Sequence, residues 1–223
     1  MVRKLSLPIK TAITLAALLA ATTAQAALTT YTSQASYLAA VGNTGIDDFN
    51  DLTSAGYIGP LSRTAGAYGY SVSSSPNSPV LYGAGPTGDA WLSTNNARDA
   101  ITFNNFTGGS IAGAGGYFFG SNIAGGFTSA TELILKATDS TGATLTYSLA
   151  NPGTSSFLGF VSTGLITSLS VSVTQPGSGF IWPTVNNLNL SVSAVPEPET
   201  YGMMLAGLGM LGLAARRRNG AKN

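Results

Sequence analysis

The residues best suited to chemistry in this sequence form an acidic run near residue 50. Asp47, Asp48 and Asp51 lie close together along the chain, with Asn50 between them. Carboxylate and amide oxygens are the hard ligands that Ca²⁺ prefers. The spacing lacks the glycine and glutamate positions of an EF-hand loop. We predict a calcium site formed by Asp48, Asp51 and Asn187, provided that the last strand lies alongside; the alternative is a solvated turn that caps the first strand.

Most other catalytic chemistry is excluded by composition. The chain has no His and no Cys, so no Ser-His or Cys-His pair and no usual zinc site can be built. Glycoside hydrolysis needs two carboxyl groups across a cleft, for which Asp89 and Asp99 are conceivable, although nothing marks them. We assign no catalytic residue and expect a non-enzymatic protein, with a secreted hydrolase as the remaining alternative.

Two further patterns have a functional and a structural interpretation. Gly83, Gly85 and Gly88 spell G-x-G-x-x-G, but the residues that follow show no helical period, so we interpret the motif as a loop rather than a dinucleotide site. The aromatic side chains Trp91 and Trp182 are candidates for stacking on sugar rings, with Tyr82 and Tyr117 as further members of the platform. The structural alternative is that they belong to the core.

Charge narrows the range of partners. Charged residues make up only 9% of the chain, against roughly 25% in an ordinary soluble domain. Between residues 27 and 194, seven acidic and three basic side chains give a net charge of −4, with no basic patch to neutralise phosphates. Nucleic-acid binding is therefore not expected. A composition that is 44% apolar, with Ser, Thr, Asn and Gly in place of charges, is typical of secreted all-β domains and not of disordered chains.

The first 26 residues predict a cleaved signal peptide. Three basic residues flank the start of an apolar core over residues 11–21, and Ala24 and Ala26 occupy the −3 and −1 positions of a cut before Ala27. These are the parts of a secretory signal. We expect signal peptidase to remove this signal helix. An uncleaved anchor is the alternative, but the apolar run is short for a membrane span.

The last 29 residues, 195–223, combine three different elements in order. Two prolines at alternate positions impose an extended segment that an enzyme cleft could hold. The apolar run over residues 202–215 would be about 21 Å long as a helix, short of a ~30 Å hydrocarbon core, so we expect a transmembrane helix that anchors the chain only transiently. The arginines that follow should stay in the cytoplasm, with the upstream chain outside.

This tail resembles the PEP-CTERM sorting signal of Gram-negative bacteria, also known by the historical name ice-binding-protein C-terminal domain, which does not imply ice binding. The resemblance is carried by the Gly/Leu/Met-rich helix and by seven further residues: Val195, Pro196, Glu197, Pro198, Arg216, Arg217 and Arg218. Glu199 departs from the Ser or Ala of many members.

The resemblance implies recognition by exosortase, a membrane-embedded cysteine protease-transpeptidase that removes the helix near the Pro-Glu-Pro element. It also implies a protein at the cell surface, in the outer membrane or in the extracellular matrix, after transient anchoring in the inner membrane. Relatives are produced alongside exopolysaccharide and are linked to biofilm.

The passenger domain, residues 27–194, is predicted to be a β-sandwich of jelly-roll type. Apolar residues alternate with Thr, Ser or Asn over residues 144–149, 169–173 and 188–192, as in half-buried strands. Further strands are expected over 101–106, 116–120, 133–137 and 157–161, with turns at 139–142 and 151–153 and one short helix at 34–41.

The passenger also resembles carbohydrate-binding-module-type jelly rolls of many PEP-CTERM proteins. The similarity is carried by five segments: 47–52, 116–122, 145–149, 157–160 and 182–188. It implies that the first and last strands are neighbours. A calcium-assisted carbohydrate-binding module that holds exopolysaccharide is therefore an alternative to a matrix component without such a site. Relatives often carry Asp where this chain has Asn186.

Overall fold

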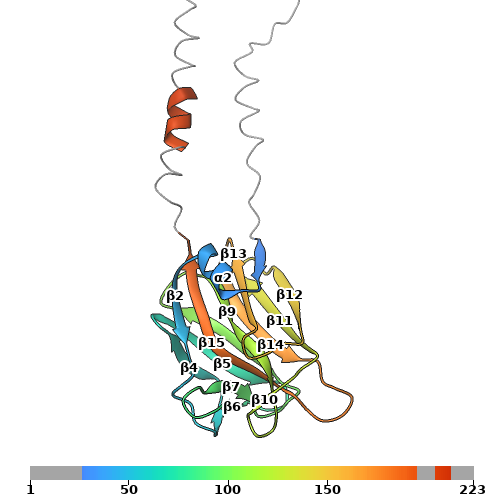
Figure 1. Ribbon diagram of the computed structural model, residues 1–223. Helices are drawn as coiled ribbons and strands as arrows, with labels where there is room; N and C mark the ends of the chain where they lie inside the picture. Colours follow the sequence, from blue (N-terminus) through green and yellow to red (C-terminus); the bar gives the residue numbers. More distant parts are fainter. Residues whose placement is uncertain (1–26, 195–203, 212–223) are drawn as a thin grey trace, which may run out of the picture.

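The computed structural model describes residues 27–194 and 204–211. The predicted signal-cleavage residues Ala24 and Ala26, the sorting motif Val195 to Pro198 and the charges Arg216 to Arg218 lie outside the described residues. Within the first range the chain forms two antiparallel sheets packed face to face, together with one short helix (Figure 1). The predicted all-β sandwich is confirmed, and its arrangement fits a jelly-roll-like passenger.

The first sheet contains nine strands in the order β1-β13-β9-β15-β7-β6-β3, with β2 also paired to β15 and β10 also paired to β9. Its bounds are β1 Leu28–Tyr31, β2 Val41–Asp47, β3 Gly56–Ile58, β6 Val80–Ala84, β7 Trp91–Thr94, β9 Ile111–Ser121, β10 Phe127–Thr128, β13 Phe157–Ser162 and β15 Trp182–Ser193.

The second sheet contains six strands in the order β12-β11-β14-β8-β5-β4. Its bounds are β4 Leu61–Ala65, β5 Tyr68–Ser75, β8 Ala100–Thr107, β11 Glu132–Asp139, β12 Thr144–Ala150 and β14 Ile166–Val173. The chain crosses between the sheets repeatedly. One main core fills the space between them, with Phe103, Phe118 and Phe160 among its fully buried members.

The last strand, β15, has the second strand, β2, as a neighbour, whereas the first strand, β1, pairs with β13, so the implied pairing of first and last strands is shifted by one strand. Strand β2 pairs with β15 in an antiparallel register that places Leu188 opposite Asp47. The start of β1 and the end of β15 lie at one end of the sandwich, and β6, β7 and β10 lie at the other end (Figure 1). We call the latter the distal end.

The predicted helix is present as α2, Gln34–Ala40, and it packs on the outer face of the first sheet. Ser33 caps it, because its hydroxyl accepts a hydrogen bond from the Ser36 amide at 3.2 Å. Tyr37 is fully buried under the helix against Phe157, with ring centroids 5.4 Å apart. Glycine in β13 makes room for it, because a Cβ on Gly159 would collide with the Tyr37 ring.

The two predicted turns have different outcomes. Residues 139–142 join β11 and β12 as a hairpin, and the buried Asp139 carboxylate organises it by accepting bonds from the Thr141 hydroxyl at 2.6 Å and the Ala143 amide at 3.1 Å. The Thr141 hydroxyl is the largest cause that lowers the pKa of Asp139. The turn at 151–153 is not a hairpin, because β12 belongs to the second sheet and β13 pairs with β1 and β9 in the first.

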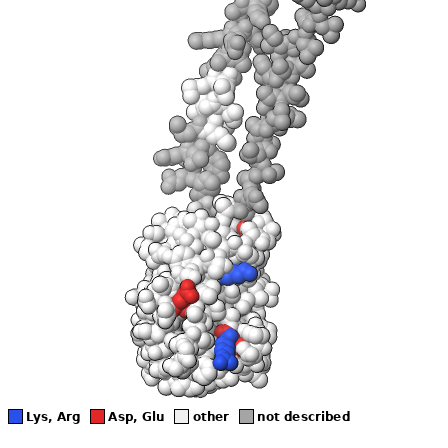
Figure 2. Space-filling model, turned by 90° about the vertical axis from the view of Figure 1, so that its right-hand side faces the viewer, with Lys and Arg blue, Asp and Glu red and all other residues white. Residues whose placement is uncertain are grey.

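The surface matches the low charge of the sequence. On the face shown in Figure 2, Lys, Arg, Asp and Glu side chains are few and isolated, and uncharged atoms cover the rest. Residues 204–211 of the C-terminal run form a helix. Among the described residues we find no helix of the length and apolarity needed to cross a membrane.

Candidate functional site

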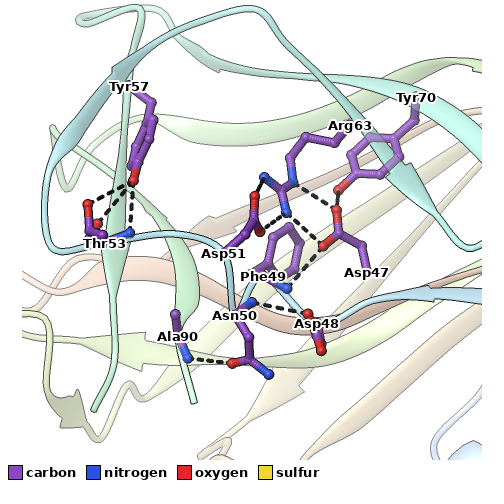
Figure 3. Close-up of polar contacts among 10 residues, drawn as sticks. All are labelled: Asp47, Asp48, Phe49, Asn50, Asp51, Thr53, Tyr57, Arg63, Tyr70 and Ala90. Atoms are coloured by element: carbon purple, nitrogen blue, oxygen red, sulfur yellow. Dashed lines mark hydrogen bonds and ion pairs between the residues drawn. The ribbon is translucent and has the colours of Figure 1, made fainter. Parts of the chain in front are cut away.

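The acidic run lies at the end of β2, where it meets the β4–β5 hairpin of the opposite sheet (Figure 3). Asp47 is 4% exposed and Arg63 of β4 reaches it with two hydrogen bonds, each 2.8 Å long, from Nε and Nη2. The Tyr70 hydroxyl of β5 donates to the same carboxylate at 2.6 Å, and the Phe49 amide donates at 3.0 Å. Asp47 is therefore satisfied on every side and ties the first sheet to the second.

Asp51 lies on the solvent side of the same guanidinium. Arg63 Nη2 donates to Asp51 Oδ1 at 2.6 Å, and Nη1 donates to Oδ2 at 3.1 Å. Burial acts to lower the pKa of Arg63, but the hydrogen bonds to Asp47 and Asp51 outweigh it and raise that pKa, while the Arg63 hydrogen bond lowers the pKa of Asp51. Arg63 also stacks over the Phe49 ring, 5.1 Å from its centroid. One arginine thus bridges two carboxylates across the sandwich.

The structure brings together part of the predicted calcium set. The β2–β15 ladder ends at the Leu188–Asp47 pair, and Asn187 and Asp48 are the residues that adjoin this pair along the two chains. Both oxygens of Asp51 are engaged by Arg63, however, and the Asn187 carbonyl accepts a 2.6 Å hydrogen bond from Asn189. Within the described part of the chain no group of three or more acidic side chains is arranged to hold a metal ion. Calcium binding stays a prediction.

An open depression of about 890 Å³ adjoins this cluster, lined mainly by polar residues of β2, β4, β5 and β8. Its charged members are Asp47, Asp48, Asp51 and Arg63. The ion pairs engage Arg63 with Asp47 and Asp51 but do not include Asp48. Sequence reasoning counted Arg63 only in the net charge and missed its role. The sequence did contain one indication of this role, because Arg63 is a single basic residue that follows closely after the acidic run.

Alkaline pH is expected to destabilise the sandwich. Burial is the largest cause that raises the pKa of both Tyr37 and Tyr70 above the ordinary value of 10.0. The folded state therefore keeps two protons that the unfolded chain loses, so the stabilisation is complete below pH 10.0 and decreases as pH rises above it. Denaturant unfolding at about pH 8 and about pH 11 measures this. The decrease in the unfolding midpoint between these two pH values should be smaller in Tyr37→Phe than in wild type. A decrease of the same size in both proteins contradicts the contribution of Tyr37.

The two carboxylates considered for hydrolysis serve other contacts. Asp99 is fully buried and accepts bonds from the Asn77 amide and side chain, each 2.7 Å, and from the Ser78 amide at 2.8 Å. It holds the loop before β6. Asp89 is exposed and accepts a 2.8 Å bond from the side chain of Asn186. The G-x-G-x-x-G segment, residues 83–88, starts at the end of β6 and continues as the predicted loop, and strand β7 follows it instead of a helix.

The two tryptophans differ in exposure, which corrects the predicted stacking pair. Trp91 is only 6% exposed and meets Phe119 edge-on, with ring centroids 4.7 Å apart. Phe119 in turn contacts Phe127, in the segment that follows β9 and folds back over this cluster. Trp91 is therefore covered and its faces are not available to a sugar, so the core alternative holds for it. Part of this cover comes from Phe119 of β9, a strand that the local sequence around Trp91 does not place beside it.

Trp182 keeps the predicted accessibility. It is half-buried at the start of β15, and its Nε1 donates to the Asn95 carbonyl at 3.3 Å. Phe180, 53% exposed, lies beside it with ring centroids 6.4 Å apart. Tyr117, a further member of the predicted platform, is half-buried near the helix, and its hydroxyl donates a hydrogen bond to Gln34 at 2.9 Å. Trp182 is therefore the member of the predicted stacking pair that a ligand can reach.

These features define an antiparallel two-sheet β-sandwich of low surface charge. The C-terminal segment matches a family model described as the PEP-CTERM protein-sorting motif, over residues 194–218. This match indicates an exported protein that is sorted by exosortase and directed to the cell surface. Comparison with curated proteins and with solved structures gives no match for the chain.

Proposed function

We propose that the exported protein is a non-enzymatic component of the cell surface or extracellular matrix of a Gram-negative bacterium, and that its sandwich associates with exopolysaccharide. The observation that carries the proposal is that the sandwich is connected directly to the sorting motif. Strand β15 ends at Ser193 and the sorting motif begins at residue 194. The sandwich is thus the part of the chain that exosortase delivers.

The placement of the carboxylates supports a binding role over hydrolysis. A glycosidase needs two carboxyl groups on either side of a cleft, one of them with a raised pKa. In the described sandwich Asp47 and Asp51 are paired with Arg63, Asp99 binds the loop before β6, and Asp139 is bonded within its own hairpin. These four carboxylates stabilise the fold and do not form a catalytic pair across a cleft. Association with the matrix is therefore the role that the fold supports best.

The test uses the protein recovered from the native host together with the host's purified exopolysaccharide. We expect the protein to sediment with the polysaccharide and to release no reducing sugar from it. Because the sandwich has few charges, the bound fraction should change little between low and physiological salt. Protein that stays entirely in the supernatant contradicts the proposed association. Release of reducing ends by the purified protein contradicts the non-enzymatic role.

A further inference from the structure

Two hollows flank Trp182 at the distal end of the sandwich. One, of about 260 Å³, is lined by Tyr82, Ser93, Asn95, Ser121, Asn122 and Trp182, and also by the exposed Ile123 and its neighbours. The other, of about 290 Å³, is lined by Asn95, Asn96, Ala97, Arg98, Phe180 and Trp182. Each volume is just below the ~300–1,000 Å³ of sites for drug-sized ligands, which suits a ligand about the size of one sugar ring. Trp182 belongs to both hollows and forms the wall between them.

The strand register builds the floor of the first hollow. Trp182 lies opposite Ser121 of β9, and Ser93 of β7 lies opposite Thr184 of β15 on one side and Tyr82 of β6 on the other. Their sequence neighbours Leu81, Leu92 and Val185 belong to the main core. Because side chains alternate along a strand, this row faces outward.

Buried hydroxyl groups make this floor polar. Ser93 and Ser121 line the hollow and the neighbouring Thr184 does not, and all three are at most 2% exposed. Thr184 Oγ1 donates to Ser121 Oγ at 2.7 Å, and Ser93 Oγ donates to the Pro183 carbonyl at 3.0 Å. These hydroxyl groups are held in place by hydrogen bonds to one another and to the backbone. They form a preorganised polar row next to the aromatic side chains of Tyr82 and Trp182.

This combination matches the chemistry of a pyranose ring. A sugar ring presents C–H groups on its faces and hydroxyl groups around its edge, so it stacks on aromatic faces and hydrogen-bonds to amides and hydroxyls at once. Tyr82 and Trp182 supply the aromatic faces, and Asn95 and Asn122 supply amides. Beyond Trp182, Arg98 places its guanidinium 5.2 Å from the centre of the Phe180 ring. Neither hollow has a carboxylate among its described lining residues, so an acidic sugar meets no like charge there.

We propose that a glycan chain lies across Trp182, with one sugar ring in the hollow beside Tyr82 and the next in the hollow beside Phe180 and Arg98. This site rests on the proposed function and specifies where the exopolysaccharide is held. It lies at the end of the sandwich opposite the end of β15, where the sorting motif begins (Figure 1). A chain attached through its C-terminus would therefore present the site away from its point of attachment.

The experiment uses the fact that the protein has two tryptophans, of which Trp91 is buried and Trp182 is accessible. Protein recovered from the host is titrated with the host's purified, soluble exopolysaccharide while tryptophan emission and its quenching by acrylamide are recorded. We expect bound glycan to shift the emission to shorter wavelength and to protect it from quenching. The Trp91→Phe variant should show the same response, since the signal comes from Trp182.

Variants at the site supply the second measurement. Trp182→Ala and Tyr82→Ala should each weaken binding by about tenfold or more, as removal of a central aromatic contact does. Trp182→Phe should recover most of the affinity because it keeps an aromatic face. Tyr31→Ala, which removes a half-buried aromatic at the opposite end, is the matched control and should bind as wild type. Circular dichroism confirms that each variant is folded.

The outcomes separate the two proposals. Wild-type binding that persists unchanged in folded Trp182→Ala and Tyr82→Ala overturns the site and leaves the association with exopolysaccharide standing. Wild-type protein that neither binds nor changes its emission overturns the proposed function, and the site with it. Loss of binding in both variants, with the control unaffected, establishes the site.

Discussion

Replacing Arg63 by Ala should destabilise the sandwich by about 3–5 kcal/mol. The side chains of Arg63 and Asp47 are only 12% and 4% exposed, so the variant leaves a buried carboxylate without its counter-charge. Tyr70 still donates one hydrogen bond to Asp47, but a neutral hydroxyl does not replace a bidentate guanidinium. Urea unfolding followed by circular dichroism gives the difference in the free energy of unfolding.

The matched control is Asp51→Asn. Its carboxylate binds the same guanidinium but is 69% exposed, so solvent screens the pair and the loss should stay within about 1 kcal/mol. Because Arg63 lowers the pKa of Asp51, that small contribution is present above the ordinary pKa of 3.8 and is lost as pH falls below it. Equal losses in Arg63→Ala and Asp51→Asn would contradict the view that the buried half of the network ties the two sheets.

Replacing Tyr37 by Ala should also cost about 3–5 kcal/mol, as large-to-small changes of buried aromatic residues do. The ring is fully buried between α2 and the first sheet, in van der Waals reach of Phe157 and directly over Gly159. The glycine cannot fill the cavity, and helix α2 has seven residues, too few to be stable without this contact. Thermal and urea unfolding both report the change, and proteolysis within residues 32–42 should become faster.

Tyr37→Phe separates the ring from its hydroxyl. The Tyr37 hydroxyl lies 2.8 Å from the Ser191 hydroxyl, which also has Thr44 as a partner at 2.7 Å. Ser191 therefore keeps a hydrogen bond in the variant, and the cost should be about 1 kcal/mol. If Tyr37→Ala is no more destabilising than Tyr37→Phe, packing of the ring is not what holds α2 on the sheet.

The parts of the fold that the sequence predicts are those where one face of a strand is buried. In β12 and β14 apolar residues alternate with Ser and Thr, and the burial along these strands follows the same period. Strands β4 and β5 were missed, although Tyr68, Tyr70 and Val72 are buried at alternate positions. Serine and glycine fill the remaining positions of β5, so its composition favoured a loop over a strand.

The candidate sites depend on contacts between segments far apart in sequence, and this limited their prediction. That Asp51 would pair with Arg63 follows only once the β4–β5 hairpin lies over the end of β2. Trp91 and Trp182 look alike in sequence, but Trp91 is buried against Phe119 of β9, whereas Trp182 is only half-buried. Tyr82 and Ser93 join Trp182 through a register that spans three strands, which local pattern cannot give. The sorting signal was predictable because its recognition depends on contiguous residues.

The central claim, export and exosortase sorting of the sandwich, is tested most directly by the intact mass of the protein recovered from the surface and medium of its native host. We expect a species that begins at Ala27 and ends between residues 195 and 200, with or without added mass. A start at Ala27 keeps β1 whole, since β1 begins at Leu28 and the Ala27 amide already bonds Thr163 at 2.9 Å. An otherwise identical strain without exosortase should retain the tail. Surface protein from the wild-type strain that still carries Arg216 to Arg218 would contradict sorting by exosortase.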